Sequence, residues 1–424
     1  MRFLPRLPRN KALLLILVPL AAACASRAAA FETADKDAKT VEEFKVRPED
    51  TEARTHYLKA EGLYFKARLP EALGEYREAV RLNPIDFDSQ YKIGLVLYEM
   101  KDRDGAVKEW KDLLALKPDY GPAHQRLGIT YREDGKLDDA VVEFIEAMKT
   151  LRDTSETRLN LGLALQERGD ADGAIEVWEK AVAEHPDFAE AHYQLGLAYL
   201  EKDQKKHDRA LAAFEAAVDA KPDFAEAHHE IAKILIQKPK KEDEAVRHWR
   251  SAIEADPSFM EARYGLAEAL EKAKKIDEAM AVYRDILGID PAQASAHARL
   301  GDLHLAKNQT DDAIFHYEEA IAASDAGEEQ EGASVRLGLG RAWLAREKYP
   351  EAVEALERAI EIDPKNAEPY FYLGLAQKGD QDYDEALKSL EQYTKLAKRR
   401  SQGINEARKT MRDIRKLIEE AEGG

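Results

Sequence analysis

The stretch YKIGLVLYEMKDRDGAVKEWKDLLALKP, from Tyr91 to Pro118, decides the fold of this chain because it recurs along it. It returns as LNLGLALQERGDADGAIEVWEKAVAEHP, from Leu159 to Pro186, and again between Tyr193 and Pro222. Each copy has a glycine in a first apolar run, an alanine four residues before an aromatic residue in a second run, and a final proline. Self-similarity at a fixed period indicates a repeat architecture rather than separate globular domains.

Ten copies can be placed on the sequence, and they start at residues 53, 87, 121, 155, 189, 225, 260, 294, 333 and 367. Each copy has a small residue in its first run: Ala60, Gly94, Gly128, Gly162, Gly196, Ala232, Ala267, Gly301, Gly340 and Gly374. Because glycine costs a helix about 1 kcal/mol relative to alanine, its recurrence indicates that two helices pack closely there. The proline ends the second helix and starts the turn to the next copy.

This pattern, Leu-Gly-x-x-Tyr followed by Ala-x-x-x-aromatic and proline, resembles the tetratricopeptide repeat. The resemblance covers residues 53–400 and implies an all-α fold, an α-solenoid in which about ten helix-turn-helix units form a right-handed superhelix. Three tryptophans fall at the aromatic place of the second helix and one at the tyrosine place of the first, which predicts core roles for Trp110, Trp178, Trp249 and Trp343. Residues 324–332 lack the proline turn, and they are interpreted as a flexible joint or a solvated loop.

The end of the chain, residues 401–424, is expected to form a helix and a short tail. Its apolar residues step by three and four, which is typical of a helix with one buried face: Ile404, Ala407, Met411, Ile414 and Ile418. Such a helix would cap the exposed end of the tenth unit, as solenoids require.

The start of the chain differs from the repeats. Basic residues at positions 2, 6, 9 and 11 precede the apolar run ALLLILVPL, which is too short for a bilayer-spanning helix of about 20 residues. Small residues follow it, and this order is typical of a secretory signal peptide over residues 1–23. Residues 24–52 lack sustained helical spacing and are interpreted as a flexible tether.

Two processing sites compete within this leader. Cys24 is the only cysteine of the chain, and it follows LAAA in a segment that resembles a bacterial lipobox. The family prefers leucine where Ala21 stands, so the match is partial, but it favours lipidation of Cys24 and an outer-membrane lipoprotein that faces the periplasm. Cleavage after Ala30 would instead release a soluble periplasmic adaptor or chaperone.

The composition narrows the function. The net charge is −18, and an excess of acid argues against nucleic-acid binding, which needs a surplus of Lys and Arg. A single cysteine rules out an internal disulfide framework and Cys-rich metal sites. We find no catalytic motif, and His124, His192, His228 and His297 recur with the repeat, which favours a structural role. The expectation is no catalytic residue, no metal and no cofactor.

Binding is expected on the first helices, which line the inner groove in the family that the chain resembles. The residues predicted to project into it are Tyr57, Tyr64, Tyr91, Tyr98, Leu159, Asn160, Tyr193, His229, Lys233 and Tyr264. Tyrosine offers apolar area and a hydroxyl at low entropy cost, which suits peptide recognition, although each residue could instead pack between units. The clamp of lysines and asparagines that some family members use for a terminal carboxylate is incomplete here.

A basic segment near the C-terminus stands out in an acidic chain. It includes Arg408, Lys409, Arg412 and Arg415, which are read either as the solvated side of the capping helix or as a docking patch for an acidic partner. Together these features predict a non-enzymatic scaffold or assembly factor of the bacterial cell envelope. The resemblance implies protein partners in pilus, secretion or polysaccharide-export machinery.

Overall fold

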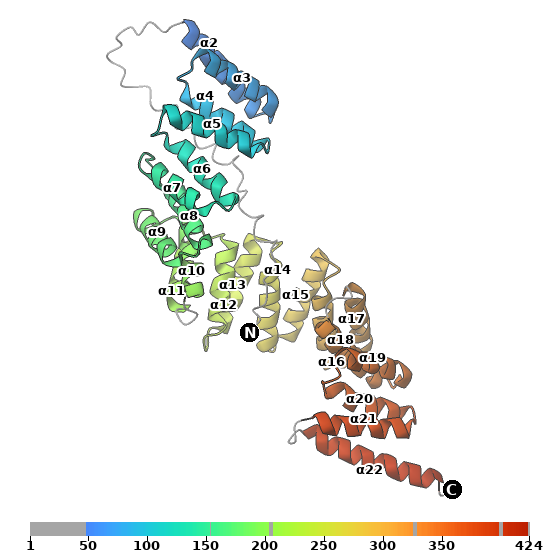
Figure 1. Cartoon of the computed structure of the whole chain (residues 1–424). Coiled ribbons are helices and arrows are strands. Elements are labelled where there is room, and N and C mark those ends of the chain that lie inside the picture. Colours follow the sequence, from blue (N-terminus) through green and yellow to red (C-terminus); the bar gives the residue numbers. More distant parts are fainter. Residues whose placement is uncertain (1–47, 153, 203–206, 325–328, 398–401, 423–424) are drawn as a thin grey trace. The chain divides into compact units, whose positions relative to one another are not determined.

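The computed structural model describes residues 48–152, 154–202, 207–324, 329–397 and 402–422, and all regular structure in these ranges is helical (Figure 1). This confirms the all-α prediction. The described chain divides into two compact units, one up to Thr130 and one from Tyr131 onward. The signal peptide, Cys24 and Ala30 lie outside the described residues.

The first unit contains two complete helix pairs and the start of a further helix. Its helices are α2 (Pro48–Tyr64), α3 (Leu69–Leu82), α4 (Phe87–Glu99), α5 (Arg103–Leu116) and α6 (Gly121–Glu133), the last of which continues past the division. Helix α2 packs on α3 and α4 on α5, and α3 also packs on α4. This is the alternating neighbour contact of a stack of hairpins.

The second unit continues the same alternation from α7 to α22. Its helices are α7 (Leu137–Met148), α8 (Ser155–Glu167), α9 (Ala171–Glu184), α10 (Ala189–Lys202), α11 (His207–Ala220), α12 (Ala225–Leu235), α13 (Glu242–Ala255), α14 (Met260–Lys272), α15 (Ile276–Ile289), α16 (Ala294–Ala306), α17 (Thr310–Ala323), α18 (Glu329–Ala345), α19 (Tyr349–Ile362), α20 (Glu368–Gly379), α21 (Tyr383–Leu396) and α22 (Gln402–Glu422). First helices of successive pairs also contact each other, as α12 does with α14 and α18 with α20. The first helices α16, α18 and α20 therefore lie in one row, and α12 lies beside α14.

The turn inside each described hairpin contains a residue in the left-handed conformation. These residues are Ala67, Lys101, Gly135, Gly169, Lys240, Lys274, Asn308, Glu347 and Gln381. A left-handed residue lets the chain reverse directly after the first helix, at a cost of about 1 kcal/mol when it carries a side chain. In three of these turns an aspartate then caps the second helix, as Asp102 does for the backbone N–H of Gly105 at 2.9 Å.

The core lies where the second helix presses its aromatic residue against the small residue of the first. Trp110, Trp178 and Phe214 are completely buried, and each lies against a glycine. A Cβ atom built on Gly162 would lie 2.2 Å from Nε1 of Trp178, well inside van der Waals contact. Glycine at this place therefore serves close helix packing.

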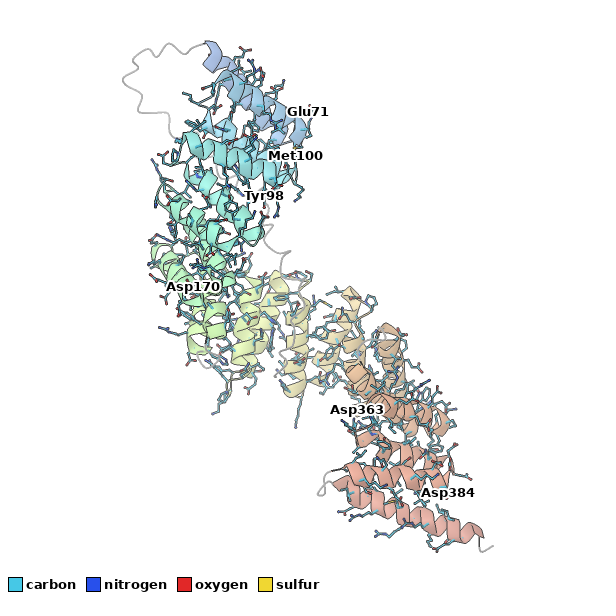
Figure 2. All side chains as sticks on the ribbon, viewed as in Figure 1. Glu71, Tyr98, Met100, Asp170, Asp363 and Asp384 are labelled. Atoms are coloured by element: carbon cyan, nitrogen blue, oxygen red, sulfur yellow. The ribbon has the colours of Figure 1, made fainter. Side chains whose placement is uncertain are left out.

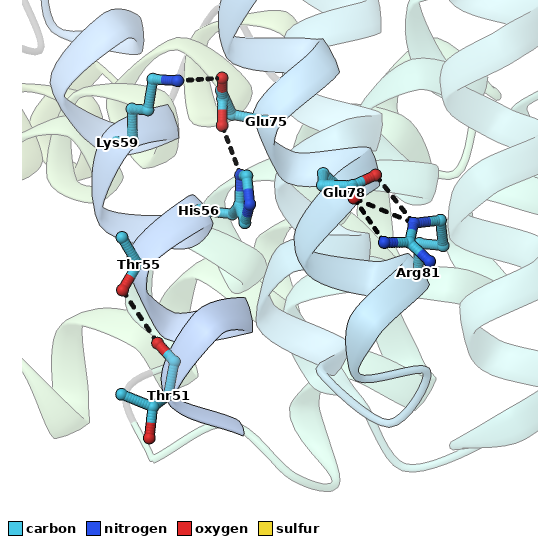
Figure 3. Close-up of polar contacts among 7 residues, drawn as sticks. All are labelled: Thr51, Thr55, His56, Lys59, Glu75, Glu78 and Arg81. Carbon is cyan, nitrogen blue, oxygen red and sulfur yellow. Dashed lines mark hydrogen bonds and ion pairs between the residues drawn. The ribbon is translucent and has the colours of Figure 1, made fainter. Parts of the chain in front are cut away.

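Polar contacts add to this packing at the first hairpin, which Figure 3 shows. Glu75 of α3 accepts from Lys59 Nζ at 2.6 Å and contacts His56 Nδ1 at 2.6 Å, so that two side chains of α2 converge on one carboxylate (Figure 3). These hydrogen bonds from Lys59 and His56 lower the pKa of Glu75. The contact favours the observed pairing of α2 with α3.

Two predicted boundaries differ from the structure. Residues 48–52, expected in the flexible tether, are helical and belong to α2. Proline is favoured at a first helical position because its fixed φ suits the helix, which accounts for a start at Pro48. Residues 329–332 of the predicted joint are the first turn of α18, where Gly332 is buried. Residues 325–328 of that joint lie outside the described residues.

The C-terminal helix α22 packs on α21 and α20. Its predicted apolar face is buried, with Ile404, Ala407, Met411 and Ile414 at less than 10% exposure. These residues form one cluster with Leu390 and Tyr393 of α21. The helix covers the apolar surface that α21 would otherwise expose.

Candidate interaction groove

The predicted groove residues all lie on first helices, and they are divided between the two units. Tyr57, Tyr64, Tyr91 and Tyr98 belong to α2 and α4, and the other six belong to α8, α10, α12 and α14. All ten retain some exposure, but Lys233 alone among them is mostly exposed. The structure therefore places them at a surface while most of their side-chain area is in contact with neighbouring helices.

In the first unit the tyrosines form a polar and aromatic network. The hydroxyl group of Tyr64 donates to Glu99, and the ammonium group of Lys92 lies 5.6 Å from the Tyr64 ring. Burial, together with the Glu99 carboxylate, raises the pKa of Tyr64, so this hydroxyl keeps its proton. Tyr91 packs against Tyr120 at 5.7 Å between ring centroids.

Tyr98 has a different environment from the other tyrosines of this unit. Its ring lies 6.3 Å from that of Trp110, and the guanidinium of Arg103 stands 5.7 Å from its centroid. Figure 2 labels Tyr98 together with Met100, an exposed apolar residue just beyond the end of α4. The network of the first unit presents aromatic edges and paired charges.

In the second unit, the side chains of Tyr193 and Asn160 and the backbone of Leu159 make contacts within the fold. Tyr193 packs against Phe214 and Phe224 at 5.6 and 5.0 Å, and the side-chain amide of Asn160 donates to the carbonyl of Glu156 within its own helix. The carbonyl of Leu159 accepts from Nε1 of Trp178 at 3.2 Å. Tyr193 therefore packs between neighbouring units, which was the alternative to projecting into the groove.

A pocket of about 210 Å³ lies where α12, α13 and α14 meet, and it includes two predicted residues, His229 and Lys233. Sequence reasoning missed the other lining residues: Ile236, Gln237, Trp249, Gly265, Glu268, Ala269 and Lys272. Apolar and aromatic residues share this lining with charged ones: Lys233 and Lys272 are positive and Glu268 is negative. Lys233 also forms an ion pair with Glu230 at 2.8 Å.

Trp249 and His229 form the most specific contact of this pocket. The indole Nε1–H of Trp249 donates to Nδ1 of His229 at 3.3 Å, and the His229 ring lies 5.1 Å from that of Phe259. Burial lowers the pKa of His229, so the imidazole is neutral at pH 7. The pocket wall is therefore held by an uncharged hydrogen bond.

Tyr264, the last predicted groove residue, lies on α14. Its hydroxyl donates to the side-chain oxygen of Gln293 at 3.2 Å, and its ring meets that of Tyr283 edge-on at 6.3 Å. The side chain therefore joins α14 to α15 and to the start of α16. Because part of its side chain is exposed, Tyr264 lies at the surface beside the groove.

The recurring histidines have a common structural contact. Ring Nε2 of His124, His192, His228 and His297 lies 2.9 to 3.2 Å from the carbonyl oxygen of the proline six residues earlier. Arg263 and Tyr370 make the same contact with Pro257 and Pro364. Because a carbonyl only accepts, the ring must donate, and the histidine satisfies the turn between units. Within the described residues there is no group of three or more His, Cys, Asp or Glu side chains that could hold a metal ion.

Comparisons with known families agree with this architecture. A tetratricopeptide repeat model matches residues 91–156, 159–225, 201–245 and 241–294, a second matches 272–329, and a TPR repeat model matches 340–381. The chain is a tetratricopeptide repeat protein. A comparison of this repeat protein with curated proteins gave no match.

Solved structures similar to this tetratricopeptide repeat protein include MamA, with 29% identity, 39% of this chain and 95% of MamA covered, and a TM-score of 0.35. Yeast Tom70 has 15% identity over 87% of this chain and 97% of its own, with a TM-score of 0.37. Pseudomonas aeruginosa pilF has 17% identity over 52% of this chain and 100% of its own, with a TM-score of 0.44.

Two further surfaces of the repeat protein were considered. A broad hollow of about 450 Å³ between α19, α20 and α21 is larger than the groove pocket, but it is open and lies against the second helices of two units. The predicted basic residues Arg408, Lys409, Arg412 and Arg415 are all exposed on α22, and Arg415 lies 3.6 Å from Glu391. In the part of the chain that the structure describes, no helix has the length and apolar character to cross a membrane.

Proposed function

We propose that this protein is a non-enzymatic interaction scaffold that grips segments of partner proteins along its first helices. The observation that carries the proposal is the pocket between α12, α13 and α14, where the Trp249 indole lies beside Lys233 and Lys272 of two first helices. A peptide that inserts an apolar side chain there would gain burial, and a carboxylate near Lys272 would gain charge complementarity, whereas at Lys233 it would compete with Glu230.

Site-specific photo-crosslinking tests this proposal. A photoreactive residue at position 233 is expected to capture a discrete partner, whereas the same residue at the exposed position 254 on α13, a second helix, is the matched control and is expected to capture none. Lys233→Glu with Lys272→Glu should reduce partner binding while the circular dichroism spectrum stays unchanged, because both lysines are exposed. Equal capture at positions 233 and 254 would refute the groove.

The cell-envelope role is a further part of the proposal and rests on the leader alone. The order of basic residues, short apolar run and Cys24 supports export and lipidation, and hence an outer-membrane scaffold whose partners belong to pilus, secretion or polysaccharide-export machinery. Metabolic labelling with a radioactive fatty acid should mark the wild type and not Cys24→Ala. If Cys24→Ala stays in the same membrane fraction as the wild type, the lipid anchor is wrong.

The alternative is a soluble periplasmic adaptor, which the Ala28–Ala30 sequence supports as a cleavage site. N-terminal sequencing of the mature protein separates the two, since it would begin at Phe31 in this case. A docking role for the basic residues of α22 is tested by reversing Arg408, Lys409 and Arg412 to glutamate, which should lower capture of an acidic partner. Unchanged capture would leave them as the solvated face of the helix.

A further inference from the structure

Two pairs of adjacent rings join α12 to α13 beside the groove pocket. Consecutive residues His228 and His229 of α12 face consecutive residues His248 and Trp249 of α13. Nδ1 of His228 lies 2.9 Å from Nδ1 of His248, and Nε1 of Trp249 lies 3.3 Å from Nδ1 of His229. The pair His228 and His248, called the inner pair, lies next to the pair His229 and Trp249, called the outer pair, which lines the pocket.

The contact between His229 and Trp249 exists in one protonation state only. An indole N–H donates and never accepts, so Nδ1 of His229 must carry no proton, and the neutral ring holds its proton on Nε2. A second proton on this ring has to go to Nδ1, where it would face the indole hydrogen. Protonation of His229 therefore breaks the contact and leaves the indole N–H of Trp249 without its partner.

The hydrogen bond between His228 and His248 survives protonation of His248 but not protonation of His228. Nε2 of His228 lies 3.0 Å from the carbonyl of Pro222, which only accepts, so this nitrogen carries a proton. Nδ1 of His228 then accepts from Nδ1–H of His248. A proton added to Nε2 of His248 keeps this bond, whereas a further proton on His228 removes it. The inner pair therefore keeps its hydrogen bond when His248 takes up a proton, whereas the contact of His229 with Trp249 has no such tolerance.

The charges around these rings are mixed. His229 faces Glu230 and Lys233 on its own helix and Glu261 on α14, and burial is the main influence that lowers its pKa. His248 faces Glu244 and Arg247 on α13 and His228 on α12, and burial again is the largest cause of its lowered pKa. Both rings are thus neutral at pH 7 and take up protons below the ordinary histidine range, which lies near 6.5.

We propose that protonation of His229 in mildly acidic solution releases Trp249, remodels the groove pocket and thereby weakens partner binding there. This regulation rests on the proposed groove function. The direction of the effect on binding follows from the pocket wall. A neutral His229 fixes the edge of the Trp249 indole, whereas a charged imidazolium between the two helices loses this hydrogen bond and is stabilised by contact with water.

The other tryptophans provide a matched control. Trp110 and Trp178 occupy the equivalent place in their units, but their indole N–H groups donate to the backbone carbonyls of Tyr91 and Leu159, which do not titrate. Phenylalanine occurs at this place in other units, as Phe144 and Phe214, so Trp→Phe substitutions there fit the fold.

The first experiment follows single-tryptophan variants of the full chain from pH 8 to pH 4.5. The variant that keeps only Trp249 should change emission and become more accessible to acrylamide, with a midpoint below about pH 6.5. The variant that keeps only Trp178 should stay flat over the same range. His229→Asn, whose side-chain oxygen can accept from the indole without titrating, should abolish the change; a Trp249 titration that persists in it refutes the proposal.

The second experiment repeats the crosslinking at position 233 at pH 7.5 and at a pH one unit below the midpoint of the Trp249 titration. Capture by the wild type should fall about fivefold at the lower pH, the effect of one lost hydrogen bond, and should not fall in His229→Asn. If Trp249 titrates but position 233 captures nothing at either pH, the groove function fails and the proton-sensitive contact stands. If capture by the wild type is equal or stronger at the lower pH, the proposed regulation is overturned. An NMR titration of the Trp249 indole signal in the wild-type chain gives the same answer without tryptophan substitutions.

Discussion

Gly94→Ala offers the sharpest test of how the repeats pack. Gly94 lies inside α4, where alanine is normally favoured, yet a Cβ atom there would lie 2.2 Å from Nε1 and 2.6 Å from Cε2 of Trp110. Trp110 is completely buried, and its Nε1–H donates to the carbonyl of Tyr91 at 3.2 Å. The added methyl group therefore has to displace a rigid ring from its hydrogen bond.

The expected loss of stability follows from three contributions. Alanine gains about 1 kcal/mol over glycine in a helix interior. Overpacking of a core costs about 1 to 3 kcal/mol, and a buried indole N–H left without an acceptor costs roughly the same. The free energy of unfolding should thus fall by about 3 kcal/mol in Gly94→Ala, within a range of about 1 to 5.

Urea denaturation followed by circular dichroism measures this change. Gly74 is the matched control because it is also helical, lies in the same unit, and has no heavy atom within 4 Å of a built Cβ. Gly74→Ala should raise the free energy of unfolding by up to about 1 kcal/mol. A Gly94→Ala variant as stable as the wild type would show that glycine at this place does not serve close packing.

Three further predictions concern other contacts of the repeats. His124→Ala should lower the free energy of unfolding in urea by about 1 kcal/mol, because the carbonyl of Pro118 loses its donor; no change would mean that water replaces the ring. Ile414→Ala should cost about 3 kcal/mol, seen as faster hydrogen exchange in α22, since the side chain is fully buried; unchanged exchange would mean that α22 is not held by this face. Burial lowers the pKa of His316 to about 4, so the unfolded chain binds more protons than the folded one between about pH 6.5 and 4, and stability should fall as the pH falls through this window. The full shift corresponds to about 3 kcal/mol, and we expect roughly half because the ring is partly exposed. Burial also lowers the pKa of His229, His248 and His304, so His316→Ala should make the slope shallower rather than abolish it, and an unchanged slope would assign it to those groups.

The repeat pattern was enough to place most helices. The first helices α4, α6, α8, α10, α12, α14 and α16 begin at the residues expected from the sequence. The proline turn and the small residue each require a particular backbone geometry. The positions of the helices along the sequence are therefore set at two points of such a unit. Three starts differ: α2 begins early at Pro48 and α18 early at Glu329, and α20 begins one residue late at Glu368. Neither early start follows a proline-ended unit.

The groove was harder to predict than the fold. Helical spacing identifies which residues lie on a first helix, but not whether a side chain faces solvent or the next helix. Tyr193 and Lys233 occupy places one helical turn apart in the pattern, yet one packs between two phenylalanines and the other is mostly exposed. Trp249 was assigned to the core, and it is 3% exposed, but its edge also lines the pocket. These differences depend on side-chain contacts between units, which the periodicity does not encode.

The last prediction concerns the methyl group of Ala232, which connects packing in the core to the hydrogen bond that lines the groove pocket. Where the small residue is Gly94 or Gly162, the tryptophan of the second helix reaches the backbone carbonyl of the first. In the sixth unit the small residue is Ala232, and the indole of Trp249 instead bonds the imidazole of His229. Since a Cβ on either glycine would overlap the indole nitrogen, we infer that the Ala232 methyl excludes Trp249 from the place of its counterparts, and the ring lies against Gly265 of α14.

Ala232→Gly should therefore let Trp249 reach the carbonyl of His229, as its counterparts do, at a helix cost of about 1 kcal/mol. The tryptophan emission should then no longer change as the pH falls, while His229 remains in place. His229→Asn is the reference for a pH-insensitive pocket, and the single-tryptophan wild type is the reference for a sensitive one. If Trp249 in Ala232→Gly still titrates like the wild type, the choice of acceptor does not depend on the methyl group, and the coupling between core and groove must arise elsewhere in α12 and α13.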